Sequence, residues 1–231
     1  MAAQNKRRWL LRIALVVLGL PLILILALFV RITWFPPRYD VPSIALVPDY
    51  KDKTLMAQAW ALPAARTYGA RVDYQSNGSV CGPSTLANVF RSLGEPVASA
   101  DAVLDGANVC QSGMCWFGLT LDELAELARS RTKRKVTLLR DLTIEQFREH
   151  LLKSNDPARR YTVNFNRGLL FGVGGGHHSP LAGYVAERDL VLVLDVNQTF
   201  EPWLVDADRL FQAMDSIDSS SGKKRGMLLV E

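Results

Sequence analysis

The sequence predicts an α+β domain that follows an apolar N-terminal segment. Helix signals concentrate in the first half of the chain and apolar, strand-like runs in the second half, an order that favours α+β over a doubly wound domain. Of the 231 residues, 48% are hydrophobic and 22% are charged, which excludes a disordered or collagen-like chain. The three cysteines are too few for a disulfide framework in a chain of this length.

Residues 13–30 form a run of 18 residues without a charge. A helix of this length would measure about 27 Å, close to the thickness of the hydrocarbon core of a bilayer. The run is longer than the apolar core of a signal peptide, and no small-x-small cleavage site follows it. We therefore expect residues 1–34 to form a cytoplasmic stub and one transmembrane anchor, in preference to a cleaved signal peptide.

The charge of the chain is distributed unevenly about this run. Residues 1–34 carry five basic residues and no acidic one, and four of the five precede the run. The positive-inside bias predicts a single-pass protein of the inner membrane, with residues 35–231 on its periplasmic or other extracytoplasmic side. Those residues carry 22 basic and 23 acidic side chains. This balance argues against a nucleic-acid partner, which needs a clustered positive excess.

Residues 35–231 are expected to form one domain, because no repeat or later linker interrupts them. The capping-box sequences Thr120-Leu-Asp-Glu and Thr143-Ile-Glu-Gln predict helices that begin near 121 and 144. Further helices are predicted at 53–62, where Pro63 stops the helix, at 85–93 and at 206–214. Strands are predicted at 136–139, 161–165, 180–186, 190–196 and 227–230.

Cys81 is the strongest candidate for a nucleophile. A loop rich in Gly, Ser and Asn leads into a helix that starts at this cysteine, and Pro83 suits the first turn. Unpaired N–H groups and the positive end of the helix dipole favour a thiolate there. The alternative is a small apolar residue packed at a helix start. Gln75 favours catalysis, because papain-type cysteine hydrolases use a glutamine at this spacing to donate to the oxyanion.

A thiolate nucleophile also needs a base, and the chain contains three histidines. His150 falls on a predicted helix, where a solvated surface position is expected. His177 and His178 follow three glycines and precede a predicted strand. If that strand and the next one pair as a hairpin, Asp195 lies beside the start of the first strand. It could then orient an imidazole, as the third member of a catalytic triad does.

With these motifs collected, the sequence resembles the phytochelatin synthase family of papain-like cysteine transpeptidases, especially its short prokaryotic members with the catalytic domain only. The resemblance covers roughly residues 40–231. It rests on the Gln-x5-Cys-Gly loop, the Gly-His-x-Ser-Pro turn and the 18-residue step from histidine to aspartate. The family register selects His177 over His178. The resemblance implies the papain-like cysteine protease fold, with a helical first half and an antiparallel sheet in the second half.

The resemblance also implies a reaction. Cys81 would attack the Cys–Gly bond of glutathione or a conjugate, release glycine and hold γ-Glu-Cys as a thioester. Water or a second glutathione would then take this acyl group. His177 would act as base and acid, Asp195 would orient it, and Gln75 would complete the oxyanion hole. The residues implied to bind the γ-glutamyl end of the substrate are Asn164, Arg167, Gly176, Asp218 and Arg225.

One departure from the family leaves the second step open. Gln198 occupies the position at which the synthases commonly carry an arginine after the aspartate. Hydrolysis of glutathione is therefore expected to compete with phytochelatin synthesis. Two alternatives to this function remain. One is a papain-like peptidase acting on another γ-glutamyl or small peptide, and the other is a non-catalytic thiol- or metal-binding protein.

Cys110 and Cys115 are separated by four residues. Two thiols without a nearby histidine make no complete zinc site, so a disulfide or two free thiols are favoured over a metal site. The implied chemistry needs no cofactor. Heavy-metal ions such as Cd or Zn would take part either bound to glutathione as its metal thiolate or as activators of the enzyme. The expected partners are glutathione and, through residues 13–30, the lipid bilayer. A homodimer is left open.

Overall fold

The computed structural model describes residue 9 and residues 15–34, 44–96, 99–107 and 118–231. The chain divides into two compact units, Met1–Pro37 and Arg38–Glu231. In the first unit, a π-helical turn (Leu15–Gly19) leads into α2 (Leu20–Trp34). No helix in the described part of the chain is both long and apolar enough to cross a membrane. The transmembrane helix predicted over 13–30, of which residues 13 and 14 are not described, is therefore not confirmed.

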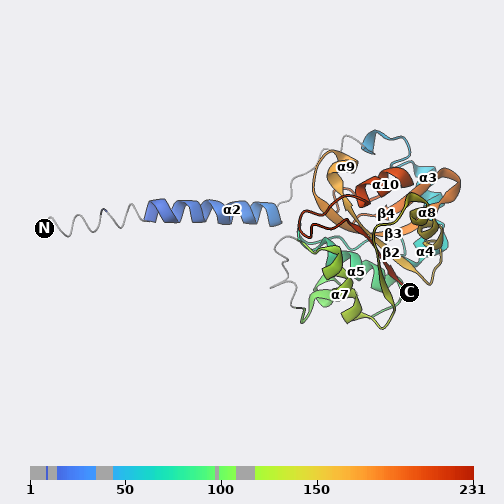
Figure 1. Ribbon diagram of the computed structural model, residues 1–231, viewed down its shortest axis with the longest axis horizontal. Coiled ribbons are helices and arrows are strands. Elements are labelled where there is room, and N and C mark those ends of the chain that lie inside the picture. Colours follow the sequence, from blue (N-terminus) through green and yellow to red (C-terminus); the bar gives the residue numbers. More distant parts are fainter. Residues whose placement is uncertain (1–8, 10–14, 35–43, 97–98, 108–117) are drawn as a thin grey trace. The chain divides into compact units, whose positions relative to one another are not determined.

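The second unit is an α+β domain whose described strands form one sheet (Figure 1). The strand order is β1-β6-β2-β3-β4-β5, and every neighbouring pair is antiparallel. The strands span Val136–Leu139 (β1), Arg160–Asn166 (β2), Gly176–Val185 (β3), Leu190–Leu194 (β4), Pro202–Asp206 (β5) and Gly226–Val230 (β6). The predicted fold class, with early helices and a late antiparallel sheet, is confirmed at this level.

The helices of this unit begin where local hydrogen bonds favour them. Both predicted capping boxes are complete, with Thr120 and Thr143 as the N-caps. Pro63 opens a new helix after the first one ends, since its missing N–H is not needed in a first turn. The described helices are α3 (Lys53–Trp60), α4 (Pro63–Thr67), α5 (Cys81–Ser92), α6 (Ala100–Leu104), α7 (Leu121–Arg131), α8 (Ile144–Lys153), α9 (Arg167–Phe171) and α10 (Ala207–Met214).

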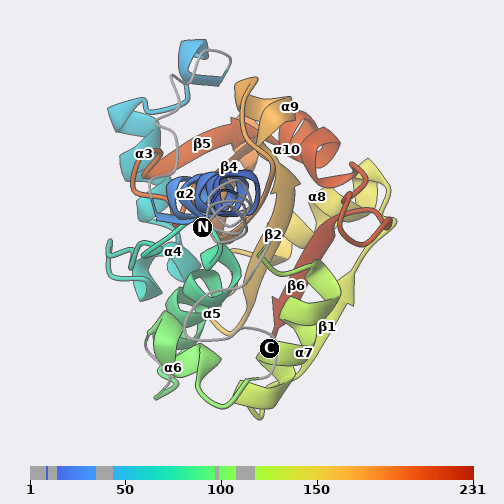
Figure 2. The same cartoon turned by 90° about the vertical axis from the view of Figure 1, so that its left-hand side faces the viewer.

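Alternation along the strands divides the core between the two faces of the sheet. Tyr161, Val163 and Phe165 of β2 face one side, where they join the core with α8 and α10. Leu192 and Leu194 of β4 face the other side, together with α3 and α4. Helices α5 and α7 complete the core against β6 and β1. Figure 2 shows α3 and α4 on the left of the strands and α8 and α10 on the right.

The start of one strand and the presence of another differ from the prediction, and both matter for the site. Strand β3 begins at Gly176, so His177 and His178 lie within the strand and not before it. Adjacent strand residues point to opposite faces, so the side chains of the two histidines lie on different sides of the sheet. In the pairing with β2, His177 is opposite Phe165 and His178 is opposite Asn164. The strand β5 was not predicted, because it begins with a proline, which lacks an N–H and is tolerated mainly at sheet edges.

Candidate active site

The nucleophile candidate Cys81 is the first residue of α5 and is buried. The N-cap residue Val80 offers no side-chain acceptor, so the dipole of the helix start is not offset by a side-chain cap. Burial raises the pKa of the Cys81 thiol. Hydrogen bonds with the His177 side chain and the His178 backbone, together with the charges of His177 and Arg167, outweigh burial and leave the pKa below its ordinary value.

His177 and Asp195 meet as the hairpin argument predicted. Strands β3 and β4 pair, and His177 Nε2 lies 3.0 Å from Asp195 Oδ1. Because Nε2 contacts the carboxylate, Nδ1 is the ring nitrogen that remains for Cys81. Burial and the charge of Arg167 lower the pKa of His177, but Asp195 and the hydrogen bond with Cys81 raise it above its ordinary value overall. A lowered thiol pKa beside a raised imidazole pKa favours a thiolate–imidazolium pair.

Asp195 is fully buried and accepts hydrogen bonds from several elements of the domain. The Asn197 N–H donates to Oδ1 at 2.8 Å, and the Trp203 indole N–H donates to Oδ2 at 3.1 Å. The Arg167 guanidinium pairs with Oδ1. Burial raises the pKa of Asp195, but Arg167 and His177 hold it well below its usual range. The carboxylate therefore stays ionised and can orient the imidazole throughout a reaction.

Gln75 lies on the loop between α4 and α5. Its backbone N–H donates to the carbonyl of Val196 at 2.7 Å, which fastens the loop before Cys81 to the residue after Asp195. The side-chain Oε1 is buried and has no hydrogen-bond partner within the described part of the chain. The loop thus brings Gln75 to the same end of the sheet as the catalytic candidates, and its oxyanion role stays a prediction.

A cavity of about 360 Å³ opens beside Cys81. Its wall includes four of the five residues predicted to bind substrate: Asn164, Gly176, Asp218 and Arg225. The Arg225 guanidinium donates to Asn164 Oδ1 at 2.8 Å and lies 3.3 Å from Asp218 Oδ1. A Cβ atom on Gly176 would collide with this guanidinium, so a larger residue there would force Arg225 to shift. The described wall offers a ligand the buried guanidinium of Arg225 and the carboxylates of Asp218 and Glu123.

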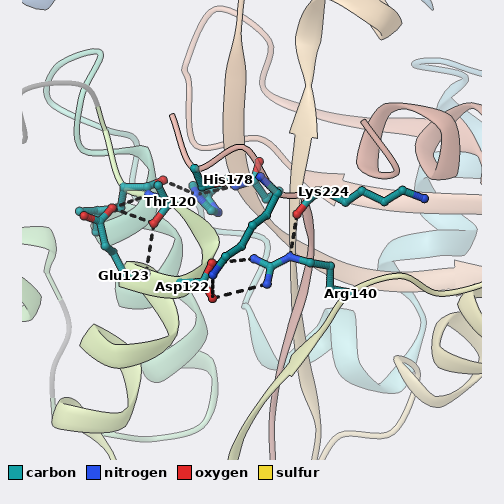
Figure 3. Close-up of polar contacts among 10 residues, drawn as sticks. Thr120, Asp122, Glu123, Arg140, His178 and Lys224 are labelled. Atoms are coloured by element: carbon teal, nitrogen blue, oxygen red, sulfur yellow. Dashed lines mark hydrogen bonds and ion pairs between the residues drawn. The ribbon is translucent and has the colours of Figure 1, made fainter. Parts of the chain in front are cut away.

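The start of α7 forms another part of the cavity wall (Figure 3). The Thr120 N–H and hydroxyl both donate to Glu123 Oε2 at 2.8 Å. Behind this turn, Asp122 pairs with Arg140 at 2.8 Å, and Arg140 Nε donates to the Lys224 carbonyl at 2.7 Å. These bonds hold α7 against the segment that carries Arg225.

The comparisons with known proteins show the family of this chain. The model of the phytochelatin synthase family matches residues 49–227. This chain belongs to the phytochelatin synthase family. Glutathione gamma-glutamylcysteinyltransferase 2 of Arabidopsis thaliana is 28% identical over 84% of this chain and 45% of its own length. The glutathione gamma-glutamylcysteinyltransferase of Schizosaccharomyces pombe is 31% identical over 68% of this chain and 41% of its own length.

The chain thus spans less than half the length of these two curated relatives of the phytochelatin synthase family. A solved structure described as a C39-like peptidase from Bacillus anthracis is similar with a TM-score of 0.49. It is 14% identical in sequence, and the match covers 70% of this chain and 95% of that chain.

Arg167 lies apart from the other residues that the phytochelatin synthase resemblance assigns to the substrate. It is buried behind Asp195, with its guanidinium carbon 4.2 Å from the centre of the Phe200 ring. Its backbone N–H donates to the Gly175 carbonyl at 2.9 Å. The cavity wall does not include it among the described residues. The structure therefore places Arg167 where it can hold the Asp195 carboxylate, and its contact with substrate stays a prediction.

Two roles, those of Trp203 and His178, were not predicted from the sequence. Trp203, on β5, donates a hydrogen bond to Asp195. The sequence feature that could have indicated this bond is an aromatic donor eight residues after the aspartate, but the strand that carries it was not predicted. His178 lines the cavity, with Nε2 2.9 Å from the Leu119 carbonyl and 3.1 Å from Asn164 Nδ2 (Figure 3). Burial lowers the pKa of His178 to about 4, so the ring is neutral and Nε2 donates to the carbonyl. Its neighbour His177 gave no hint of this role.

The described residues contain no group of three or more His, Cys, Asp or Glu side chains that could hold a metal ion. Cys110 and Cys115 lie outside the described ranges, so the choice between a disulfide and two free thiols stays open. His150, expected on the surface, is half-buried, and its Nδ1 lies 3.1 Å from the Tyr161 hydroxyl.

Proposed function

We propose that this chain cleaves the Cys–Gly peptide bond of glutathione through a thioester on Cys81. The observation that carries the proposal is the buried line of Cys81, His177 and Asp195 beside a cavity walled by Arg225 and Asp218. The γ-glutamyl end of glutathione carries an α-carboxylate and an α-ammonium group. A guanidinium and a carboxylate are the complementary partners of these two charges.

The acylation step follows from the protonation states. The Cys81 thiolate attacks the carbonyl carbon of the substrate's cysteine, and the Cys81 N–H with the Gln75 amide stabilises the oxyanion. The His177 imidazolium gives its Nδ1 proton to the glycine nitrogen as the C–N bond breaks. Glycine leaves, and γ-Glu-Cys remains bonded to the sulfur. Asp195 holds the ring through Nε2 during both states of the imidazole.

The thioester is then passed to water or to a second glutathione. His177 takes a proton from the attacking water or amine, the C–S bond breaks, and the thiolate is restored. We propose that hydrolysis outweighs transfer, because Gln198 replaces the arginine common in the synthases and supplies no cation at that position. Heavy-metal ions enter this scheme as part of the substrate, bound to the glutathione thiolate.

The reaction is tested by incubating the purified protein with glutathione, with and without Cd²⁺, and analysing the products by mass. We expect free glycine and γ-Glu-Cys, smaller amounts of (γ-Glu-Cys)2-Gly, and a covalent γ-Glu-Cys adduct on Cys81. Cys81→Ser is the matched control, which should form no thioester. Absence of glycine release by the wild type would reject the proposal and favour a peptidase for another small peptide.

We also propose that residues 13–30 attach the chain to the inner membrane, with residues 35–231 on the extracytoplasmic side. The support is the uncharged run of 18 residues and the basic residues that precede it. A C-terminal alkaline phosphatase fusion should be active in cells and should sediment with membranes. An inactive fusion would reject the orientation, and a processed, freely soluble protein would reject the anchor.

A further inference from the structure

A second cavity, of about 470 Å³, lies between α3 and the segment that enters β5. Apolar and aromatic side chains form part of its wall, among them Met56, Trp60 and Tyr74. Two lysines, Lys51 and Lys53, stand in the same wall. Pockets that bind small molecules commonly combine a mostly apolar lining with a few placed polar groups. The cavity thus suits a small anionic ligand with an apolar portion.

The backbone around this cavity is held in an unfavourable conformation. Ala70 and Glu201 both line it, and they adopt positive φ values of 51° and 54°. They are two of the four non-glycine residues with positive φ in the described part of the chain. Such residues concentrate at ligand sites, because the surrounding structure must hold them there. The Lys51–Glu201 ion pair, at 3.0 Å, ties the two sides of the cavity together.

The two cavities flank the segment that carries the nucleophile. Tyr74 belongs to the second cavity, whereas Gly78 and Cys81 belong to the first. Between them, Gln75 is bonded through its N–H to the Val196 carbonyl at 2.7 Å. The segment after Val196 continues to Glu201 in the second cavity. An acyl group held in the first cavity would therefore have the second cavity on the far side of Gln75.

We propose that this second cavity binds the acyl acceptor, an anionic thiol peptide of which a second glutathione is the simplest. This inference rests on the proposed function, since it names where the second substrate of that reaction lies. Glutathione carries two carboxylates and one ammonium group. Lys53, for which no ion pair is found among the described residues, supplies a cation for one carboxylate, and Lys51, which pairs with Glu201 at 3.0 Å, adds a second positive charge beside it. Trp60 and Tyr74 supply apolar surface for the thiol-bearing residue.

The transfer step then balances without a further reactant. The free α-amino nitrogen of the acceptor attacks the thioester carbonyl, a C–N bond forms and the C–S bond breaks. His177 takes the amine proton, and the Cys81 thiolate is restored. Water gives the same balance with a C–O bond, so the second cavity governs the ratio of transfer to hydrolysis and not the rate of acylation.

Lys53 is the sharpest position for a test. It is exposed at the first position of α3, and no ion pair is found for it among the described residues. A glutamate at a helix N-terminus is favoured by the helix dipole, so Lys53→Glu retains the helix while reversing the charge in the cavity. Lys133→Glu is the matched control, because Lys133 is also exposed and lies outside both cavities.

The experiment measures glycine release and the ratio of (γ-Glu-Cys)2-Gly to γ-Glu-Cys over a range of glutathione concentrations. We expect Lys53→Glu to keep wild-type glycine release and to lower the ratio about tenfold, with the deficit shrinking at high salt because salt screens exposed charges. Lys133→Glu should match the wild type at every salt concentration. A purely structural effect of Lys53 would not depend on salt in this way.

Each outcome separates the two proposals. A wild type that releases no glycine rejects the proposed function itself. A wild type that releases glycine while Lys53→Glu and Lys133→Glu show the same ratio overturns the acceptor site alone. A wild type that makes no transfer product at any glutathione concentration also overturns the acceptor site, and it leaves the hydrolase intact.

Discussion

Arg167 and Asp195 form a buried ion pair directly behind His177, the candidate catalytic histidine. Their side chains are 6% and 0% exposed, so both charges have been removed from water. Such pairs contribute little net stability, but the loss of one partner is strongly destabilising, because the other charge is left buried and uncompensated. The same guanidinium charge lowers the pKa of the Cys81 thiol. Arg167 is therefore a positioning residue that also influences the charge state of the nucleophile.

Arg167→Lys and Arg167→Gln test this role through the pH dependence of kcat/KM for glycine release. Since the charge of Arg167 lowers the pKa of Cys81, its removal raises that pKa. The acid limb of the profile should move to higher pH in Arg167→Gln. Arg167→Lys keeps the charge and should restore most of the shift. A residue that only bound the substrate carboxylate would raise KM and leave the limb in place.

The two adjacent histidines should separate cleanly in kinetics. His177→Ala and Cys81→Ser should abolish glycine release, because each removes a partner of the thiolate–imidazolium pair. His178→Ala should keep most of kcat and raise KM severalfold, because His178 donates to the Leu119 carbonyl in the cavity wall. An active His177→Ala together with an inactive His178→Ala would contradict the assignment.

Trp203→Phe removes one hydrogen bond from the Asp195 carboxylate while keeping most of the aromatic packing. Leaving a buried acceptor unpaired costs about 1–3 kcal/mol. We expect the free energy of unfolding in urea to fall by roughly that amount. Activity should fall as well, since Trp203 Nε1 is the donor to Oδ2 of the carboxylate that orients His177. Unchanged stability would show that water or another donor replaces the indole.

Gln198→Arg should raise the ratio of synthesis to hydrolysis. Gln198 is exposed on the loop between Asp195 and β5, so the substitution should be tolerated. A charge-assisted hydrogen bond contributes about 1.5–3 kcal/mol, which corresponds to roughly a ten- to hundredfold preference for a bound anionic acceptor. The measurement is the product ratio by mass at millimolar glutathione. Efficient formation of long products by the wild type would contradict the idea.

Features that depend on neighbouring residues in the chain could be read from the sequence. The capping boxes at Thr120 and Thr143 start α7 and α8 through hydrogen bonds that span three residues. His177 and Asp195 meet because His177 lies on β3 and Asp195 directly follows β4, the next strand of the hairpin. Cys81 lies at a helix start because a flexible loop precedes an apolar helical period. Local hydrogen bonding and periodicity were sufficient for these predictions.

Relationships between distant residues required the tertiary structure. The sequence could not show whether the Arg167 side chain contacts a ligand, solvent or a buried partner. Packing places it against Asp195, 28 residues away. Arg225 reaches Asn164 across 61 residues, and Gly176 leaves room for its guanidinium. The second cavity joins residues 51–74 to residues 201 and 202. Long-range packing determines which of several possible partners each side chain contacts, and local sequence patterns do not contain that information.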